Sequence, residues 1–392
     1  MTTYSVDKLS MDILDDNFVK IFQPIHIVQY LLGTLQVKIQ YGFTTSPSYG
    51  YDVFSVFVWI IHIVSLFIFT VYCESSNDSM LTDFYLKLGH ILNGLIIAMV
   101  TIRNFCKSTS GSHLYVKLQK IDRDLNMKTS RKRNKHTSIL STVFATAVVV
   151  FIAIWSIVLN LYVIKDSCPV AFIIQLSILG NYMDIILIFF QMYFVVIRLE
   201  YMNSILKEKI NKLTCVAEGT METYFVLNET YNADDKLWNR FAIALRDIVS
   251  VLDDLINYHQ FTIFGLTCEF IILDMLLIQS IVTTIKQQIP INTLSIINVI
   301  PVVMLLLFIS LLSITVELLK SKMGDSRKLC TTILRFSNDT TRDKMKRILL
   351  LLDVKKKIYI YDIYSLDAQL PLNLFAITAT YTIVLLQFAL LL

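Results

Sequence analysis

Charge, glycine and proline are all scarce in this sequence. Charged residues make up 17% of the 392 residues, against 55% that are hydrophobic, and only ten Gly and six Pro occur. Soluble domains carry about 25% charged residues, so the composition excludes an ordinary soluble protein. The scarcity of residues that interrupt helices indicates a largely helical chain. We therefore expect an all-α integral membrane protein.

Signals for secretion and for enzyme chemistry are also missing. The first twenty residues contain four Asp and no apolar core, so we expect insertion through the first transmembrane helix rather than a cleaved signal peptide. The six Cys and six His show no metal-ligand spacing, and there is no nucleophile motif or phosphate-binding loop. We expect no enzyme activity, no cofactor and no bound metal. The basic residues do not alternate with aromatics, so we expect no nucleic-acid partner.

Seven apolar stretches are long enough to cross the hydrocarbon, which needs about 20 helical residues. They are 52–72, 82–102, 138–164, 170–198, 258–285, 292–317 and 368–390. An eighth apolar run, 21–33, is shorter and contains Pro24, so we interpret it as a re-entrant or interfacial segment. Apolar residues repeat every three or four positions in 206–213 and 241–255. The fourth and fifth spans are therefore expected to continue as helices beyond the membrane.

Basic residues indicate the orientation of the seven spans. The residues before 52 and the segments 103–137, 198–257 and 318–367 together hold 32 of the 35 Lys and Arg. Positively charged loops stay in the cytoplasm. We therefore expect the N-terminus inside and, after seven crossings, the C-terminus outside. A G-protein-coupled receptor has the opposite orientation.

Two features fall on the predicted outside face. Asn77 begins an Asn-Asp-Ser sequon in the first outside loop, where an N-linked glycan can be added. Cys73 and Cys168 lie at outside ends of helices, in a compartment that permits disulfides. Either they form a bridge between the first two outside loops or both are free thiols, and the sequence leaves both open.

The last span carries a polar stripe. Asn373, Thr380 and Gln387 recur every seven residues and share one helix face. The same face holds Ile383, Val384 and Leu391, and an adjacent aromatic stripe holds Tyr381 and Phe388. Polar groups inside a membrane face protein or water, because exposing them to lipid is costly. The stripe either hydrogen-bonds a neighbouring helix or lines a pore, and the spacing alone leaves both open.

Part of this span resembles a known signature. Thr380-Tyr381, followed after five residues by Gln387-Phe388 in TYTIVLLQF, resembles the C-terminal signature of insect gustatory receptors. It lies where that family carries it, in the last transmembrane helix. The pair Leu32-Gly33 before the first span, Arg198 and Asn203 after the fourth, and the segment 361–367 before the last are also similar to the family.

This resemblance implies a homotetrameric ligand-gated cation channel. The last helix, in 368–392, would line a central pore, and the cytoplasmic helices in 318–367 would form an anchor shared by four subunits. The resemblance makes 52–317 a six-helix ligand-binding bundle and 1–51 a cytoplasmic N-terminus. It assigns Gln387 to the pore near the outer gate, and Tyr381 and Phe388 to packing behind the pore wall. Leu391 is the alternative gate, as an apolar constriction that dewets.

A ligand pocket in the outer half of each bundle is also implied by the resemblance. Ligand sites are mostly apolar with a few placed polar groups. The polar and aromatic residues of the outer half-spans are His90, Asn93, Trp155, Ser156, Asn160, Gln175, Asn181, Tyr182, Asp184, Gln279, Thr283 and Asn298. Alternatively, Trp155 and Tyr182 belong to an interfacial aromatic belt and the amides bond between helices. Glu269 and Asp274 in the fifth span either face a hydrated cavity, or Glu269 pairs with a nearby hydroxyl.

Together these features predict a gustatory receptor in the plasma membrane of sensory neurons, a non-selective cation channel opened by a small tastant. Thr382 stands where sugar-sensing members carry an acidic residue, which favours a bitter compound or other plant metabolite. A sugar-responsive channel of the same family is one alternative, and a G-protein-coupled chemoreceptor is the alternative from a different class. The expected partners are the tastant, permeating cations, membrane lipid, and further copies of the chain or related receptors.

Overall fold

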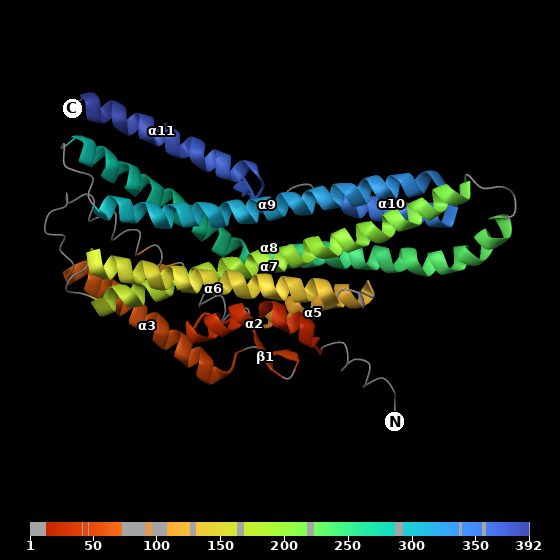
Figure 1. Cartoon of the computed structure of the whole chain (residues 1–392), viewed down its shortest axis with the longest axis horizontal. Helices are drawn as coiled ribbons and strands as arrows, with labels where there is room; N and C mark the ends of the chain where they lie inside the picture. Colours follow the sequence, from red (N-terminus) through yellow and green to blue (C-terminus); the bar gives the residue numbers. More distant parts are fainter. Residues whose placement is uncertain are drawn as a thin grey trace.

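Long helices running side by side form almost all of this computed structural model (Figure 1). The structure describes residues 13–40, 42–45, 47–72, 91, 94–95, 108–125, 131–162, 168–217, 223–286, 293–336, 339–354 and 358–391. The helices are α2 (Asp16–Leu31), α3 (Tyr49–Tyr72), α5 (Ser108–Asp124), α6 (Arg131–Tyr162), α7 (Cys168–Ala217), α8 (Thr223–Lys286), α9 (Thr293–Phe336), α10 (Asp339–Val354) and α11 (Gln369–Leu391). In Figure 1, the C-terminal ends of α6, α8 and α11 lie on the same side of the molecule as the N-terminal ends of α7 and α9.

The predicted spans correspond to helices wherever the structure describes them. Within the described part of the chain, five helices are long and apolar enough to cross a membrane, judged by length and composition: α6, α7, α8, α9 and α11. A shorter apolar helix, Tyr49–Ser65, belongs to α3. Six of the seven predicted spans coincide with α3, α6, α7, α8, α9 and α11. None of the six extends more than two residues beyond its helix. The second span, 82–102, lies almost wholly outside the described residues.

Three helices are much longer than a membrane is thick. The lengths of α7, α8 and α9 are 50, 64 and 44 residues, whereas about 20 are enough to cross the hydrocarbon. The predicted continuation of the fourth and fifth spans as helices is therefore confirmed. Helix α10 packs against α8 and α9 in this extended half (Figure 1).

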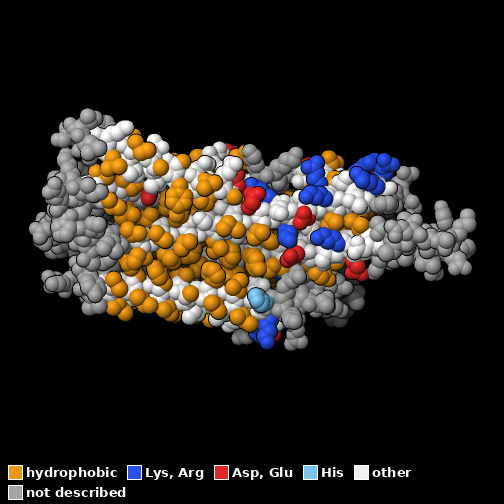
Figure 2. Space-filling view, turned by 45° about the horizontal axis from the view of Figure 1, so that its top comes forward, with side chains coloured by type: hydrophobic (Ala, Val, Ile, Leu, Met, Phe, Trp, Pro, Cys, Tyr) orange, Lys and Arg blue, Asp and Glu red, His pale blue; other side chains and the backbone are white. Residues whose placement is uncertain are grey.

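Side-chain chemistry divides the molecule along its length. On the face drawn in Figure 2, hydrophobic side chains cover one half, and Lys, Arg, Asp and Glu gather over the other. The charged half is the one that contains the extensions of α7, α8 and α9. A boundary of this kind is typical of a protein that sits partly in a bilayer and partly in water.

Two regions differ from the sequence-based expectation. The segment 103–137, treated as a loop, contains helix α5, which packs against α8. The segment 318–367, expected to be helical, ends in a hairpin of β3 (Tyr359–Ile360) and β4 (Tyr364–Ser365). Tyr361 and Asp362 in its turn have φ values of 50° and 56°, which a right-handed helix cannot accommodate. A second hairpin pairs β1 (Lys38–Gln40) with β2 (Phe43–Thr45).

The apolar run 21–33, expected as a re-entrant or interfacial segment, is the greater part of helix α2. The helix continues through Pro24 and packs against α6 and α7. It ends at Gly33, whose φ of 74° is a conformation that glycine adopts without strain. The N–H of Thr34 donates to the carbonyl of Gln29 at 2.9 Å, the hydrogen bond that closes a Schellman C-cap.

Helix α7 is the centre of the bundle. From Leu179 to Leu199, every side chain except that of Tyr193 is buried. Arg198 is fully buried: its Nε and Nη2 donate to the Asp122 carboxylate of α5 at 2.5 and 2.7 Å, and Nη2 also donates to Asn134 of α6 at 3.0 Å. Its guanidinium lies over the Phe194 ring, 3.3 Å from the centroid. One cation therefore joins three helices.

Loss of this buried cation should destabilise the receptor strongly. Arg198→Ala leaves the Asp122 carboxylate without its cation, and breaking a buried pair of this kind costs about 3–5 kcal/mol. Arg327→Ala is the matched control, because Arg327 pairs with Asp353 at 3.1 Å with both side chains over a third exposed, and exposed pairs contribute about 0–1 kcal/mol. The thermal midpoint of the purified receptor, followed by size-exclusion chromatography, measures both. Equal midpoints for the two variants would contradict the assignment.

Candidate functional site

Helix α11 is the least buried of the long helices. It contacts α8 and α9, and on that side Leu370 and Leu374 are buried. Most of its other described side chains are exposed in the single chain, including large apolar ones such as Leu372 and Phe375. Figure 1 shows α11 at the edge of the bundle, with its C-terminal end at the same end of the molecule as the start of α9. A helix with one packed face can take part in a second contact.

The predicted polar stripe lies on the open side of α11. Asn373, Thr380 and Gln387 are all exposed, and so are Ile383 at 56% and Val384 at 41%. The Thr380 hydroxyl donates to the carbonyl of Ala376 in its own helix at 2.8 Å, so it needs no neighbouring helix.

The adjacent aromatic stripe is described only in part. Tyr381 is half-buried, closer to the packed side than the polar stripe is. Phe388 and Leu391 are helical, and their side chains lie outside the described part of the structure.

Three contacts join α8 to the final hairpin and to α11. Thr378 on the packed side of α11 donates to the Asp274 carboxylate at 2.5 Å. The Thr267 and Tyr364 hydroxyls are 2.9 Å apart, and burial raises the pKa of Tyr364 to about 12, so this phenol stays protonated. Phe264 packs edge-on against Tyr361, with ring centroids 5.7 Å apart.

Both acidic residues of the fifth span are buried in the bundle. Asp274 accepts the hydrogen bond from Thr378 of α11, so its partner is a hydroxyl of the last helix. Glu269 is also buried. Asp274 therefore pairs with a hydroxyl, and the pairing considered for Glu269 stays a prediction.

Removal of the Thr378 hydroxyl should loosen α11. Thr378→Val keeps the side-chain shape but leaves the buried Asp274 carboxylate without this donor, at a cost of about 1–3 kcal/mol. Thr382→Val is the matched control, because the Thr382 hydroxyl bonds only to the carbonyl of Thr378 in its own helix. Thermal unfolding of the purified receptor should show the larger loss for Thr378→Val. Equal losses would mean that the contact with Asp274 contributes no stability.

The ligand residues expected from the sequence fall into three groups. Trp155, Ser156, Asn181, Tyr182 and Asp184 are buried, and Gln279 is half-buried. His90 and Asn93, like the glycosylation candidate Asn77 and the disulfide candidate Cys73, lie outside the described residues. Asn160, Gln175, Thr283, Asn298 and the second disulfide candidate, Cys168, are helical, and their side chains are not described.

The buried members cluster on α6 and α7. The Tyr182 ring packs against Phe308 of α9 with centroids 5.1 Å apart. The Asp184 carboxylate accepts a hydrogen bond from the Gln29 amide of α2 at 2.6 Å. These residues face the interior of the bundle, so a position in an interfacial belt does not describe Trp155 or Tyr182.

A hollow of about 210 Å³ lies elsewhere, between the end of α2, α3 and α7. Gly33, Thr34, Val58, Trp59 and Gly180 are among the residues that line it. Of the expected residues whose side chains the structure describes, Trp155, Ser156, Asn181, Tyr182, Asp184 and Gln279, none lines it. Its residues come from three distant segments and share no spacing, so no sequence pattern could have grouped them.

Two further buried polar residues lie on α7: Gln191, which the sequence reasoning missed, and Arg198, which it noted only as part of the resemblance to the family. Asp184, Gln191 and Arg198 recur every seven residues, and each bonds a different set of helices. The Gln191 amide donates to the Tyr115 hydroxyl of α5 at 3.2 Å and lies 3.0 Å from the His259 ring of α8. We call Asp184, Gln191 and Arg198 the α7 polar line. The spacing of seven was the signal that could have found it.

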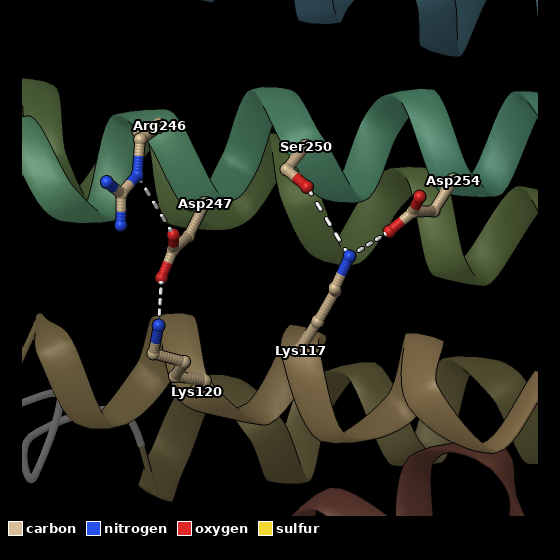
Figure 3. A network of polar contacts seen from close by, with 6 residues as sticks. All are labelled: Lys117, Lys120, Arg246, Asp247, Ser250 and Asp254. Atoms are coloured by element: carbon tan, nitrogen blue, oxygen red, sulfur yellow. Dashed lines mark hydrogen bonds and ion pairs between the residues drawn. The ribbon is translucent and has the colours of Figure 1, made fainter. Parts of the chain in front are cut away.

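Ion pairs fasten α5 to α8 outside the apolar half (Figure 3). Lys117 contacts Asp254 and lies 3.4 Å from the Ser250 hydroxyl. Lys120 lies 2.7 Å from the Asp247 carboxylate, which Arg246 approaches at 3.7 Å. Both lysines are nearly half exposed, so each pair contributes little by itself. Together they hold α5 in register with α8.

Comparison with known proteins places the chain in a family. No curated protein matches it. The solved structure of the insect olfactory receptor OR5 from Machilis hrabei, in complex with eugenol, is similar to this chain with a TM-score of 0.61. The match covers 95% of this chain and 100% of that chain at 13% identity, a level at which it shows the fold alone.

The family model described as "7tm Chemosensory receptor" matches residues 22–392. It therefore spans the bundle, the extended helices and the last helix. Because this match covers nearly the whole sequence, the protein belongs to the 7tm chemosensory receptor family.

Proposed function

We propose that this protein is a gustatory receptor that acts as a homotetrameric ligand-gated cation channel, with α11 lining the pore. The exposed polar stripe of α11 carries the proposal. Asn373, Thr380 and Gln387 lie on a side of the helix that the chain itself leaves open. Amides exposed to lipid are costly, whereas amides facing a water-filled pore are not. Four copies around one axis would turn these stripes toward one another.

The resemblance to gustatory receptors supports the taste assignment. It rests on Thr380-Tyr381 and Gln387-Phe388, and Thr382 favours a bitter compound or other plant metabolite over a sugar. The olfactory receptor of similar fold was solved with a small molecule, eugenol. We place the tastant of this chain in the outer half of the bundle, beside the buried residues Trp155 and Tyr182.

The orientation proposed here has the N-terminus inside and the C-terminus outside. The 32 of 35 Lys and Arg assigned to one side support it, and so does the gathering of charge over one half of the molecule in Figure 2. Under this orientation the extended ends of α7, α8 and α9, with α10, lie in the cytoplasm. They would form the anchor shared by four subunits.

A link between ligand and pore is available through α8. Asp274 and Thr267 of α8 bond Thr378 of α11 and Tyr364 of the hairpin, so a shift of α8 would move the pore helix. The ligand can shift the equilibrium only by its difference in affinity for the closed and open arrangements. Gln387 is the proposed narrow point near the outer mouth, with Leu391 as the rival gate.

Channel activity without G proteins tests the function. Cells that express this chain alone, dialysed with GDP-β-S to block G proteins, should pass cation current in response to a member of a panel of sugars, plant alkaloids and glycosides. Replacing external sodium with N-methyl-D-glucamine should remove the inward current, and untransfected cells should give none. A response that disappears under GDP-β-S would support the G-protein-coupled alternative instead.

Cysteine accessibility tests the pore face. Asn373→Cys, Thr380→Cys and Gln387→Cys should make the current sensitive to a charged methanethiosulfonate, because water reaches these positions. Leu386→Cys is the matched control, since Leu386 is exposed at nearly the same depth but lies about 100° around the helix from Gln387. Tyr381→Cys and Phe388→Cys should instead lower the yield of assembled receptor. Equal modification at Leu386 and Gln387 would remove the pore assignment.

A further inference from the structure

The hollow between α2, α3 and α7 lies at a level that the sequence assigns to the membrane. Val58 and Trp59 belong to the predicted span 52–72, and Leu176 and Gly180 to the span 170–198. The lining is mostly apolar, and among its described residues there is no Asp, Glu, Lys or Arg. Leu31 at the rim is 68% exposed, so the hollow is open at the surface of the apolar half. Such a site suits a neutral molecule that arrives through lipid.

Backbone geometry, rather than loose packing, makes the hollow. The left-handed Gly33 turns the chain away from α2, and the Ser55 hydroxyl of α3 donates to its carbonyl at 2.5 Å. A Cβ at Gly33 would lie 3.2 Å from the Val58 side chain, and one at Gly180 would lie 3.1 Å from that of Thr34. Two glycines therefore let three chain segments approach closely at one edge of the hollow. Because these contacts are already tight, the neighbouring space cannot close by simple collapse.

Among the polar atoms of the lining that make no hydrogen bond within the described structure, two bear on the occupant. They are the indole Nε1 of Trp59 and the hydroxyl oxygen of Thr34, both buried from solvent. A buried group without a partner costs about 1–3 kcal/mol, so such groups call for an explanation. An indole N–H can only donate, whereas a hydroxyl can donate or accept. Because both atoms are closed to a water-sized probe, an occupant that carries an acceptor oxygen would satisfy them after a small turn of the Trp59 and Thr34 side chains toward it.

We propose that this hollow is a binding site for a small, neutral, single-ring molecule that carries one hydrogen-bond acceptor. An apolar cavity of about 150 Å³ accepts benzene, so about 210 Å³ allows a ring with a short oxygen-bearing substituent. The Trp59 N–H donates to the acceptor of the bound molecule, while its ring lies among the apolar side chains. The site is separate from the outer-bundle residues to which we assign the tastant.

The site is also connected to the centre of the bundle. The Tyr51 hydroxyl accepts from the N–H of Leu35 at 2.9 Å and donates to the carbonyl of Gln29 at 3.2 Å. The Gln29 side chain bonds Asp184 of the α7 polar line. An occupant beside Gly33 therefore lies against the helix end that carries this contact.

Binding to the receptor in lipid nanodiscs tests the proposal. The probe is 4-fluoroacetophenone, followed by fluorine NMR line broadening in phosphatidylcholine nanodiscs, with empty nanodiscs as the measure of partition into lipid. Val58→Phe fills the hollow and should weaken binding at least about tenfold. Val53→Phe is the matched control, because Val53 is on the same helix, is 53% exposed and does not line the hollow, so binding should be unchanged. Equal binding by the two variants would overturn the site.

A second pair of probes tests the hydrogen bond. In 4-fluoro-α-methylstyrene a methylene group replaces the carbonyl oxygen of 4-fluoroacetophenone, with the same shape and no acceptor. Trp59→Phe removes the N–H and also part of the ring, so both probes share the effect of the smaller ring, and the ketone should weaken about three- to tenfold more than the styrene because it alone loses the hydrogen bond. Equal effects on the two probes, or none on either, would overturn the role of Trp59. The assay measures binding and not current, so its outcome is independent of the proposed channel function.

Discussion

Burial of α7 on every side is the constraint on which the rest of this structure depends. In lipid, apolar side chains gain little from leaving the membrane for a helix interface, so packing and interhelical hydrogen bonds hold helices together. The α7 polar line supplies such bonds. Asp184 meets α2, Gln191 meets α5 and α8, and Arg198 meets α5 and α6. Each bond sets the register of one neighbour against the central helix.

Helix α11 has the opposite character. Its packed side contacts α8 and α9, with the hydrogen bond between Thr378 and Asp274 on the α8 side, and most of its other described side chains are exposed. Elements with few buried contacts are the ones that move at low cost. The same protein thus combines a rigid centre with a last helix that is free to be repositioned. Such a division suits a channel whose ligand site and pore lie on different helices.

The sequence predictions succeeded where the signal lies within one short segment and failed where the structure depends on residues far apart in the chain. Hydropathy located six apolar helices, five of them long enough within the described residues to cross a membrane, because a run of about 20 apolar residues is a local property. The hairpin at 359–365 was missed because left-handed Tyr361 and Asp362 are held by surrounding contacts, such as that of Tyr361 with Phe264. Helix α5 was read as a loop because the basic residues of the whole segment 103–137 concealed the buried positions Leu114, Leu118 and Ile121. The heptad spacing that revealed the stripe on α11 was also present on α7 and was not followed.

By itself the sequence determined where helices can cross a membrane, the unequal distribution of basic residues and the polar face of the last helix. These depend on composition and on the 3.6-residue period, which any single segment carries. Only the tertiary structure decided that Asp274 bonds the last helix, that Arg198 is buried between α5 and α6, and that Trp59 and Gly180 share one hollow. Those partners are 64 or more residues apart in the chain, so packing alone could bring them together.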